Sequence, residues 1–187
     1  DGCSVLEHCL QVDLFGRGVQ LHAARDVVEM LEHQALGARR VAVGRDCRLS
    51  SPELAAAFVE GARSQGAQVT DIGVVGTDML YYYVARHDLD GGAIVTASHN
   101  PKEWNGVKLV RRGALALSGD EGIKEIREWL VAGRYADAPP LRGGLGSATV
   151  REDYARHCLS FVDQAAIPRV KVVLDTANGM GAVGAEA

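Results

Sequence analysis

The chain has 187 residues, with 20 basic and 24 acidic side chains, a formal net charge of −4 and 47% hydrophobic residues. This length allows one complete domain and part of another, with a core that covers both faces of a parallel sheet. The charges are spread without blocks, and no apolar run approaches the ~20 residues of a membrane span. We therefore expect a globular protein whose partners include neither nucleic acid nor a membrane.

The four cysteines show no pairing pattern. Cys3, Cys9, Cys47 and Cys158 form no C-x-x-C pair and have no histidine at zinc-finger spacing, so neither a structural metal nor a disulfide framework is predicted. The N-terminus lacks the basic and apolar regions of a signal peptide. These features predict isolated thiols in a reducing cytoplasm, and they carry no indication of an oligomeric state.

From Arg40 onward, short apolar runs alternate with amphipathic stretches, which is typical of strand-helix-strand units. The run 41–43 predicts the first clear strand. It leads into a helix start at which Ser50 and Glu53 have capping-box spacing and Pro52 suits the first turn. The elements expected next are a helix end near Gln65 and Gly66, a strand over 69–75, and a helix over 79–86 that Thr77 or Asp78 caps.

The apolar run 92–95 predicts a buried strand that ends just before a cluster of polar residues, Ser98, His99 and Asn100. Ligands bind at the strand ends of open α/β sheets, so a chemical role is expected there. A bare Ser-His-Asn cluster more often satisfies the backbone of a turn. A hydrolase triad is not predicted, because adjacent Ser and His side chains point apart and no G-x-S-x-G elbow is present.

The second half of the chain predicts a return strand and then a new unit. A strand over 106–110 follows the polar cluster so closely that it indicates a hairpin, and a capped helix over 118–133 follows. We expect a layered αβα domain with a mixed, mostly parallel sheet over 1–135 and a linker over 136–149. A second, similar domain is expected to start at 150–187, with a helix over 151–164 and a strand over 170–174. That strand needs partners, so we expect a truncated polypeptide.

Three strings resemble one family. Thr-Ala-Ser-His-Asn-Pro at 96–101, followed by Asn-Gly-x-Lys at 105–108, resembles the active-site serine loop of the α-D-phosphohexomutases, the family of phosphoglucomutase and phosphomannomutase. Gly-Arg-Asp-x-Arg-x-Ser at 44–50 and Asp-x-x-Asn-Gly-x-Gly at 175–181 are similar to further family signatures. The resemblance covers roughly 40–181. It implies an enzyme that interconverts hexose 1-phosphate and hexose 6-phosphate through a phosphoserine and a hexose 1,6-bisphosphate.

The resemblance also implies roles for the residues of the serine loop. Ser98 would carry the phosphoryl group, because a serine hydroxyl is a poor nucleophile until a base and a cation assist it, and its phosphate ester persists in water. His99 and Asn100 would donate hydrogen bonds to phosphate or sugar oxygens. Lys108 would act as a general acid or base, or neutralise charge in the transition state.

The remaining expectations concern phosphate, metal and activity. Arg45 and Arg48 would lie near the same sheet edge, although an Arg/Asp pair in such a loop most often fixes the loop. Arg17 has only a weak match to an arginine that faces the phosphoserine. The family implies Mg²⁺, bound in part through the phosphate of Ser98, with a phosphorylated hexose as substrate and hexose 1,6-bisphosphate as activator. The family's Asp-Gly-Asp-x-Asp-Arg metal loop does not occur here, so we expect these residues alone to be close to inactive.

Two alternatives stand beside this interpretation. The string G-x-G-x-x-G at 179–184 follows the predicted strand 170–174, as in a dinucleotide-binding fingerprint, but residues 175–178 place its first glycine too far from the strand for the tight turn. A non-catalytic binding remnant of the same fold is the second alternative. No residue here selects one sugar, although the serine loop fits the phosphomannomutase/phosphoglucomutase branch better than the phosphoglucosamine branch.

Overall fold

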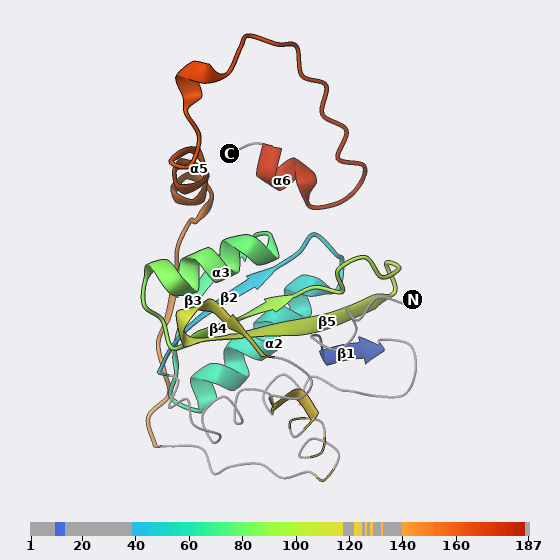
Figure 1. The fold of residues 1–187 in the computed structure, drawn as a ribbon. Coiled ribbons are helices and arrows are strands. Elements are labelled where there is room, and N and C mark those ends of the chain that lie inside the picture. Colours follow the sequence, from blue (N-terminus) through green and yellow to red (C-terminus); the bar gives the residue numbers. More distant parts are fainter. Residues whose placement is uncertain are drawn as a thin grey trace.

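A computed structural model describes residues 10–13, 39–117, 122–124, 126, 128, 132 and 140–185. Within these ranges a single sheet lies between helices (Figure 1). The strands are β1 (Leu10–Asp13), β2 (Arg40–Arg45), β3 (Gln68–Val74), β4 (Gly91–Val95), β5 (Trp104–Arg111), β6 (Leu115–Ala116) and β7 (Leu145–Ser147). The helices are α2 (Ser51–Ser64), α3 (Thr77–Arg86), α5 (Arg151–Leu159) and α6 (Gly181–Ala185), with 3-10 turns at Arg112–Ala114 and Gln164–Ala166.

The sheet is mixed, with strand order β1-β5-β4-β2-β3-β7 and β6 paired to β5. Strands β4, β2, β3 and β7 run parallel, whereas β5 runs antiparallel to β4 and to β1. The connection from β4 to β5 is too short for a crossover, so the chain must reverse there. This confirms the predicted layered α/β fold, including the return strand after the serine loop.

The two faces of the sheet carry separate cores. Alternate residues of a strand point to opposite faces, so Val41 and Val43 pack with Phe58 of α2, whereas Ala42 packs with Leu80 of α3. Figure 1 shows α2 and α3 on opposite sides of the sheet. Strand β4 is buried along its whole length. That burial on both faces explains why its sequence is a continuous apolar run.

The starts of the helices differ in detail from the expectation. Helix α2 has Ser50 as its N-cap and Pro52 in its first turn, as predicted, but the Ser50 side chain makes no capping bond, so the expected capping box with Glu53 is wrong. The Ser50 hydroxyl instead accepts a hydrogen bond from Asn105 Nδ2 at 2.9 Å. Helix α3 begins after Gly76 as its N-cap, one residue before the nearer of the two predicted caps.

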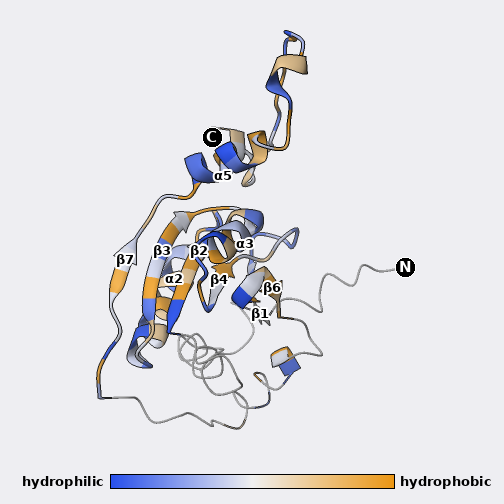
Figure 2. Cartoon of the chain, turned by 60° about the vertical axis from the view of Figure 1, so that its left-hand side comes forward, coloured by the Kyte–Doolittle hydropathy of each residue, from blue (hydrophilic) through white to orange (hydrophobic). Residues whose placement is uncertain are grey.

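Strand β7 lies within the range that the sequence predicts as a linker. It pairs in parallel with the edge strand β3, with Val69 opposite Leu145 and Asp71 opposite Ser147. Figure 2 shows this strand at the outer edge of the sheet, beside β3. Its three residues are all exposed and include a glycine, so no alternation of apolar and polar residues marks it.

The C-terminal segment is only partly as predicted. Helix α5 forms but ends at Leu159, and the predicted strand over 170–174 is wrong, because those residues are exposed and belong to no strand of the described chain. An apolar run without a hydrogen-bonding neighbour has no ladder to join.

The predicted helix over 118–133 lies largely outside the described residues, although Ile123 and Ile126 are buried in the α2-side core. None of the described helices is long and apolar enough to cross a bilayer.

Candidate active site at the end of strand β4

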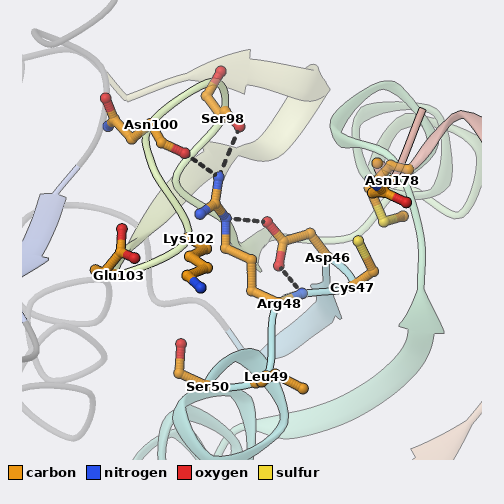
Figure 3. Close-up of a pocket in the computed structure, with 12 residues that line it drawn as sticks. Asp46, Cys47, Arg48, Leu49, Ser50, Ser98, Asn100, Lys102, Glu103 and Asn178 are labelled. Atoms are coloured by element: carbon orange, nitrogen blue, oxygen red, sulfur yellow. Dashed lines mark hydrogen bonds and ion pairs between the residues drawn. The ribbon is translucent and has the colours of Figure 1, made fainter. Parts of the chain in front are cut away.

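A cavity of about 660 Å³ lies where β2 and β4 end (Figure 3). Two loops of the sheet and one turn of the C-terminal segment form its wall. The lining residues are Asp46, Cys47, Arg48, Leu49, Ser50, Ser98, Asn100, Lys102, Glu103, Asn178, Gly179 and Met180. The carboxyl ends of parallel strands are the expected position of a binding site in an open α/β sheet.

Ser98 lies on the wall of this cavity, in the turn that follows β4. Its backbone has φ of +54°, a left-handed conformation that few residues other than glycine adopt without support from their surroundings. Its N–H donates a hydrogen bond to Thr96 Oγ1 at 3.1 Å. In Figure 3 the Ser98 carbonyl faces Arg48, whereas the hydroxyl points away from that guanidinium.

The other predicted residues of the serine loop occupy different positions. Asn100 is half-buried and lines the cavity with Ser98, and its N–H donates to Ala97 O at 3.0 Å. His99 is exposed and is not a lining residue. Lys108 is half-buried on β5, which follows the loop, and it lies opposite Ile94 of β4, which precedes the loop.

One of the two predicted phosphate-binding arginines, Arg45, does not line the cavity. Arg45 forms an ion pair with Asp71, with Nη1 and Oδ1 2.9 Å apart, and this pair ties β2 to β3. Asp71 Oδ1 also accepts a hydrogen bond from the N–H of Gly73 at 2.8 Å. Arg17 lies outside the described residues.

Asp46 is the acidic anchor of the site. It is 6% exposed and accepts hydrogen bonds from Arg48 Nε at 3.1 Å, from the Arg48 N–H at 3.0 Å and from Ser51 Oγ at 2.5 Å. A buried carboxylate needs such donors, because its charge is otherwise costly to bury. The Arg/Asp pair therefore fixes its own loop, as the sequence interpretation favours.

Arg48 also reaches the serine loop. The sequence predicts that it lies near the same sheet edge but does not indicate these contacts. Its two terminal nitrogens donate to four backbone carbonyls of that loop. The bonds are Nη2 to Ser98 O at 3.0 Å and to Asn100 O at 2.8 Å, and Nη1 to Pro101 O at 2.7 Å and to Trp104 O at 3.2 Å. The contacts span about fifty residues of sequence, so no local pattern marks them.

Asn105 connects the same region to helix α2. Its side chain is fully buried, and Nδ2 donates to Ser50 Oγ and to Ser51 Oγ, each at 2.9 Å. Its Oδ1 accepts from the N–H of Gly106 at 2.9 Å. Arg48 therefore holds the carbonyls along the loop from Ser98, and Asn105 holds the point at which the loop enters β5.

The charges around the cavity are mixed. The wall carries two cations, Arg48 and Lys102, and two acidic residues, Asp46 and Glu103. Since Asp46 and Arg48 are paired, the exposed side chains of Lys102 and Glu103 form the charged surface nearest to solvent. In the part of the chain that the structure describes, no three His, Cys, Asp or Glu side chains gather as a metal site would require. A phosphoryl group on Ser98 would supply oxygen ligands of the kind that Mg²⁺ prefers, but the described residues do not form a Mg²⁺ site by themselves.

The dinucleotide alternative lacks its structural context. The fingerprint requires a strand, a tight turn and a helix in succession. Here the glycines at 179–184 follow a segment without strand structure, and α6 has only five residues. The arrangement does not favour a nucleotide site.

Comparisons with known proteins point to one family. The model of phosphoglucomutase/phosphomannomutase, alpha/beta/alpha domain I, matches residues 17–134. A phosphomannomutase of Vibrio cholerae is 38% identical over 141 residues, which cover 75% of this chain and 30% of the relative. Phosphohexose mutases of Xanthomonas campestris are 40% identical over 139 residues, which cover 74% of this chain and 31% of the relative. The chain thus spans about a third of the length of these relatives.

Solved structures agree. A phosphoglucomutase/phosphomannomutase family protein from Burkholderia thailandensis matches with a TM-score of 0.69 and 29% identity, over 82% of this chain and 34% of that one. The phosphoglucomutase pp63/parafusin from Paramecium matches with a TM-score of 0.63 over 78% of this chain and 32% of that one. At 16% identity, the second likeness is one of fold alone.

Proposed function

Because this chain belongs to the phosphoglucomutase/phosphomannomutase family, we propose that it carries the phosphoryl-accepting serine of a phosphohexomutase. The reaction of the whole protein would interconvert a hexose 1-phosphate and a hexose 6-phosphate. The observation that supports this most is the position of Ser98, on the wall of a cavity at the carboxyl end of β4. A hydroxyl there is accessible to a sugar phosphate and is flanked by hydrogen-bond donors.

The chemistry assigned to Ser98 is a reversible phosphoryl transfer. The hydroxyl oxygen attacks a phosphorus of hexose 1,6-bisphosphate, so that the Ser98 Oγ–P bond forms as the sugar O–P bond breaks. The serine proton passes to the sugar oxygen that leaves. The reverse step delivers the phosphoryl group to the other hydroxyl of the next sugar phosphate, which accounts for the bisphosphate as activator.

The neighbours of Ser98 take supporting roles in this proposal. Asn100, which lines the same cavity, donates its amide to a phosphoryl or sugar oxygen. His99 and Lys108 carry the proton between Ser98 and the sugar, and the ammonium of Lys108 also neutralises charge that develops on the phosphoryl oxygens. His99 is not a lining residue, and Lys108 lies within β5, after the loop, so both must reach the reacting atoms from the edge of the site.

Phosphate binding and the metal complete the proposal. Arg45 would bind a phosphate only after its ion pair with Asp71 breaks. Arg17 is proposed as a phosphate-binding residue from the family alone. Mg²⁺, when bound, supplies charge neutralisation at the phosphoryl oxygens, and this chain contributes to it only the phosphate of Ser98. We therefore expect no mutase turnover from this chain by itself, and only a single slow transfer from the bisphosphate to Ser98 during a long incubation.

Intact-mass spectrometry tests the assignment. The chain is incubated with glucose 1,6-bisphosphate and Mg²⁺, and the account predicts a gain equal to one phosphoryl group that Ser98→Ala abolishes. Cys47→Ala is the matched control, because the exposed Cys47 lines the same cavity and its replacement should keep the gain. An unchanged mass in the unsubstituted chain would favour the non-catalytic binding module instead, and retention of NAD would favour the dinucleotide alternative.

A further inference from the structure

The guanidinium of Arg48 has no N–H left for a ligand. An arginine side chain carries five N–H donors in a fixed fork. Nε donates to Asp46, and the two terminal nitrogens donate to four carbonyls, those of Ser98, Asn100, Pro101 and Trp104. Only 14% of the side chain is exposed, although it lines the cavity. All five donors are therefore used inside the protein.

The serine loop needs these bonds to keep its shape. Its carbonyls converge on one point, and Ser98 has the left-handed φ of +54°. Non-glycine residues in that region are strained and persist only where their surroundings hold them in place. The bond from Arg48 to the Ser98 carbonyl turns the peptide plane inward, and this leaves the hydroxyl on the other side (Figure 3).

The Arg48 side chain is itself held rigidly. The Asp46 carboxylate accepts hydrogen bonds from Nε and from the backbone N–H of Arg48. It also accepts one from the hydroxyl of Ser51, the first residue of α2. The loop conformation is thus transmitted from helix α2 through Asp46 and Arg48 to Ser98. A group fixed in this way supplies preorganisation.

We propose that Arg48 is a positioning residue of the phosphoryl transfer. It fixes the orientation of the Ser98 hydroxyl from within the loop and makes no contact of its own with the phosphate. This inference rests on the proposed function of Ser98. The second arginine of the Gly-Arg-Asp-x-Arg string therefore sets the geometry of the serine. Other cations would recognise the phosphate.

Substituting lysine separates geometry from charge. Arg48→Lys keeps the positive charge but cannot reproduce a planar fork with five donors. If Arg48 acts by position, Arg48→Lys and Arg48→Met should both slow the phosphorylation of Ser98 by glucose 1,6-bisphosphate, on the order of 10- to 100-fold. The matched control is Arg156→Lys, which changes an exposed arginine that is paired with Asp153 and does not line the cavity. It should leave the rate within about twofold.

A second readout does not depend on the chemistry. In ¹H–¹⁵N spectra, Arg48→Lys should shift the amide signals of Ser98 and Asn100, whereas Arg156→Lys should leave them in place. Asp46→Asn, which removes the charge that anchors Arg48, should shift the same signals in a smaller degree. It supplies this readout if Arg48→Lys fails to fold.

The outcomes separate the two proposals. Unchanged serine-loop amides in Arg48→Lys and Asp46→Asn would overturn the positioning role. So would a wild-type phosphorylation rate in Arg48→Lys combined with a loss in Arg48→Met, because that pattern indicates charge alone. If no variant, including the unsubstituted chain, takes up phosphate, the proposed function fails while the amide signals still decide whether Arg48 sets the loop.

Discussion

The side chain of Asn105 is fully buried between the start of α2 and the start of β5. It satisfies the hydroxyls of Ser50 and Ser51 and the N–H of Gly106. Buried polar groups of this kind contribute little net energy when paired but are costly when a partner is removed. The residues that hold the serine loop are therefore expected to affect stability as well as geometry.

Replacing Asn105 by alanine should destabilise the fold. The substitution leaves up to three polar groups without their partner, and each unsatisfied buried group costs about 1–3 kcal/mol. Urea unfolding, followed by circular dichroism, measures the loss. Glu103→Ala changes an exposed residue of the same loop and should stay within about 0.5 kcal/mol. Equal stability of the two variants would contradict the role assigned to Asn105.

Asp90 provides a residue-level test of pH dependence. Burial acts to raise its pKa, but hydrogen bonds from the N–H groups of Arg40 and Arg39, together with the Arg112 guanidinium, outweigh it and hold the pKa below the usual value. A lowered carboxyl pKa stabilises the fold above the unfolded-state pKa of about 3.9. That contribution is lost as the pH falls through the folded-state pKa.

Asp90→Asn should therefore reduce the free energy of unfolding at neutral pH and flatten its dependence on pH. Urea unfolding from about pH 6 down to about pH 3 measures both effects, and the unsubstituted protein should lose more stability than the variant over that window. Parallel curves for the two proteins would contradict the account.

How far the sequence predicts the site depends on how local each signal is. Ser98 and Asn100 belong to a contiguous string, and the structure brings both to the cavity. The contacts of Arg48 with the loop from Ser98 to Trp104 cannot be predicted from spacing, because they arise only when β2 and β4 lie side by side. The role of such a residue becomes visible in the tertiary structure alone.

The glycines before β7 fasten the chain to the sheet at the level of elements. The N–H of Gly143 donates to Arg63 O at 2.8 Å, and its carbonyl accepts from Arg63 Nε at 3.1 Å. A Cβ at this position would lie 1.8 Å from the Ala67 carbonyl oxygen. The close approach of the two backbones therefore requires glycine.

Gly143→Ala should loosen this attachment and cost about 1–3 kcal/mol, because the backbones must separate to admit the methyl group. Gly146→Ala is the matched control within β7, since a Cβ there meets nothing within 4 Å, and it should be close to neutral. Thermal unfolding of both variants compares them. If Gly146→Ala destabilised the protein as much as Gly143→Ala, the space around the two glycines would not account for their effect on stability.

A helix or strand can be predicted from the sequence where its apolar residues recur in a regular pattern. Strands β2 to β5 and helices α2 and α3 are predicted from runs and periodicity, because each buries a face. Helix α5 is predicted from its periodicity although none of its residues is buried. Strand β7 buries nothing and has no pattern to find. The run at 170–174 has the apolar pattern of a strand but no neighbour among the described residues, so the pattern alone is insufficient.

At the scale of the whole molecule, helix α5 lies against α3. The ring of Tyr82 is 5.5 Å from that of Tyr154 and 4.7 Å from that of His157, measured between centroids. Tyr154 donates to Asp78 Oδ2 at 2.5 Å, and this bond raises the pKa of the Tyr154 phenol. Aromatic pairs of this kind contribute about 0.5–1.5 kcal/mol beyond their buried area. The contacts join the C-terminal segment to the sheet domain.

Tyr82→Ala should release α5 without unfolding the sheet. Hydrogen exchange followed by mass spectrometry should show faster exchange over 151–159 and unchanged exchange in β2 and β4, because local openings precede global unfolding. Tyr82→Phe keeps the ring contacts but removes the bonds that the Tyr82 hydroxyl donates to Asp153, so its exchange rates should lie between those of Tyr82→Ala and the unsubstituted chain. Unchanged exchange in α5 of Tyr82→Ala would mean that these rings do not hold the helix.

The measurement that tests the central claim most directly is localisation of the phosphate by peptide mapping. After incubation with glucose 1,6-bisphosphate, tandem mass spectrometry assigns the modified residue within the peptide that spans β4 and the serine loop. The account predicts the phosphoryl group on Ser98 and its absence from every other serine. Phosphate found only on another residue, or an unmodified Ser98 in a chain that binds the bisphosphate, would contradict it.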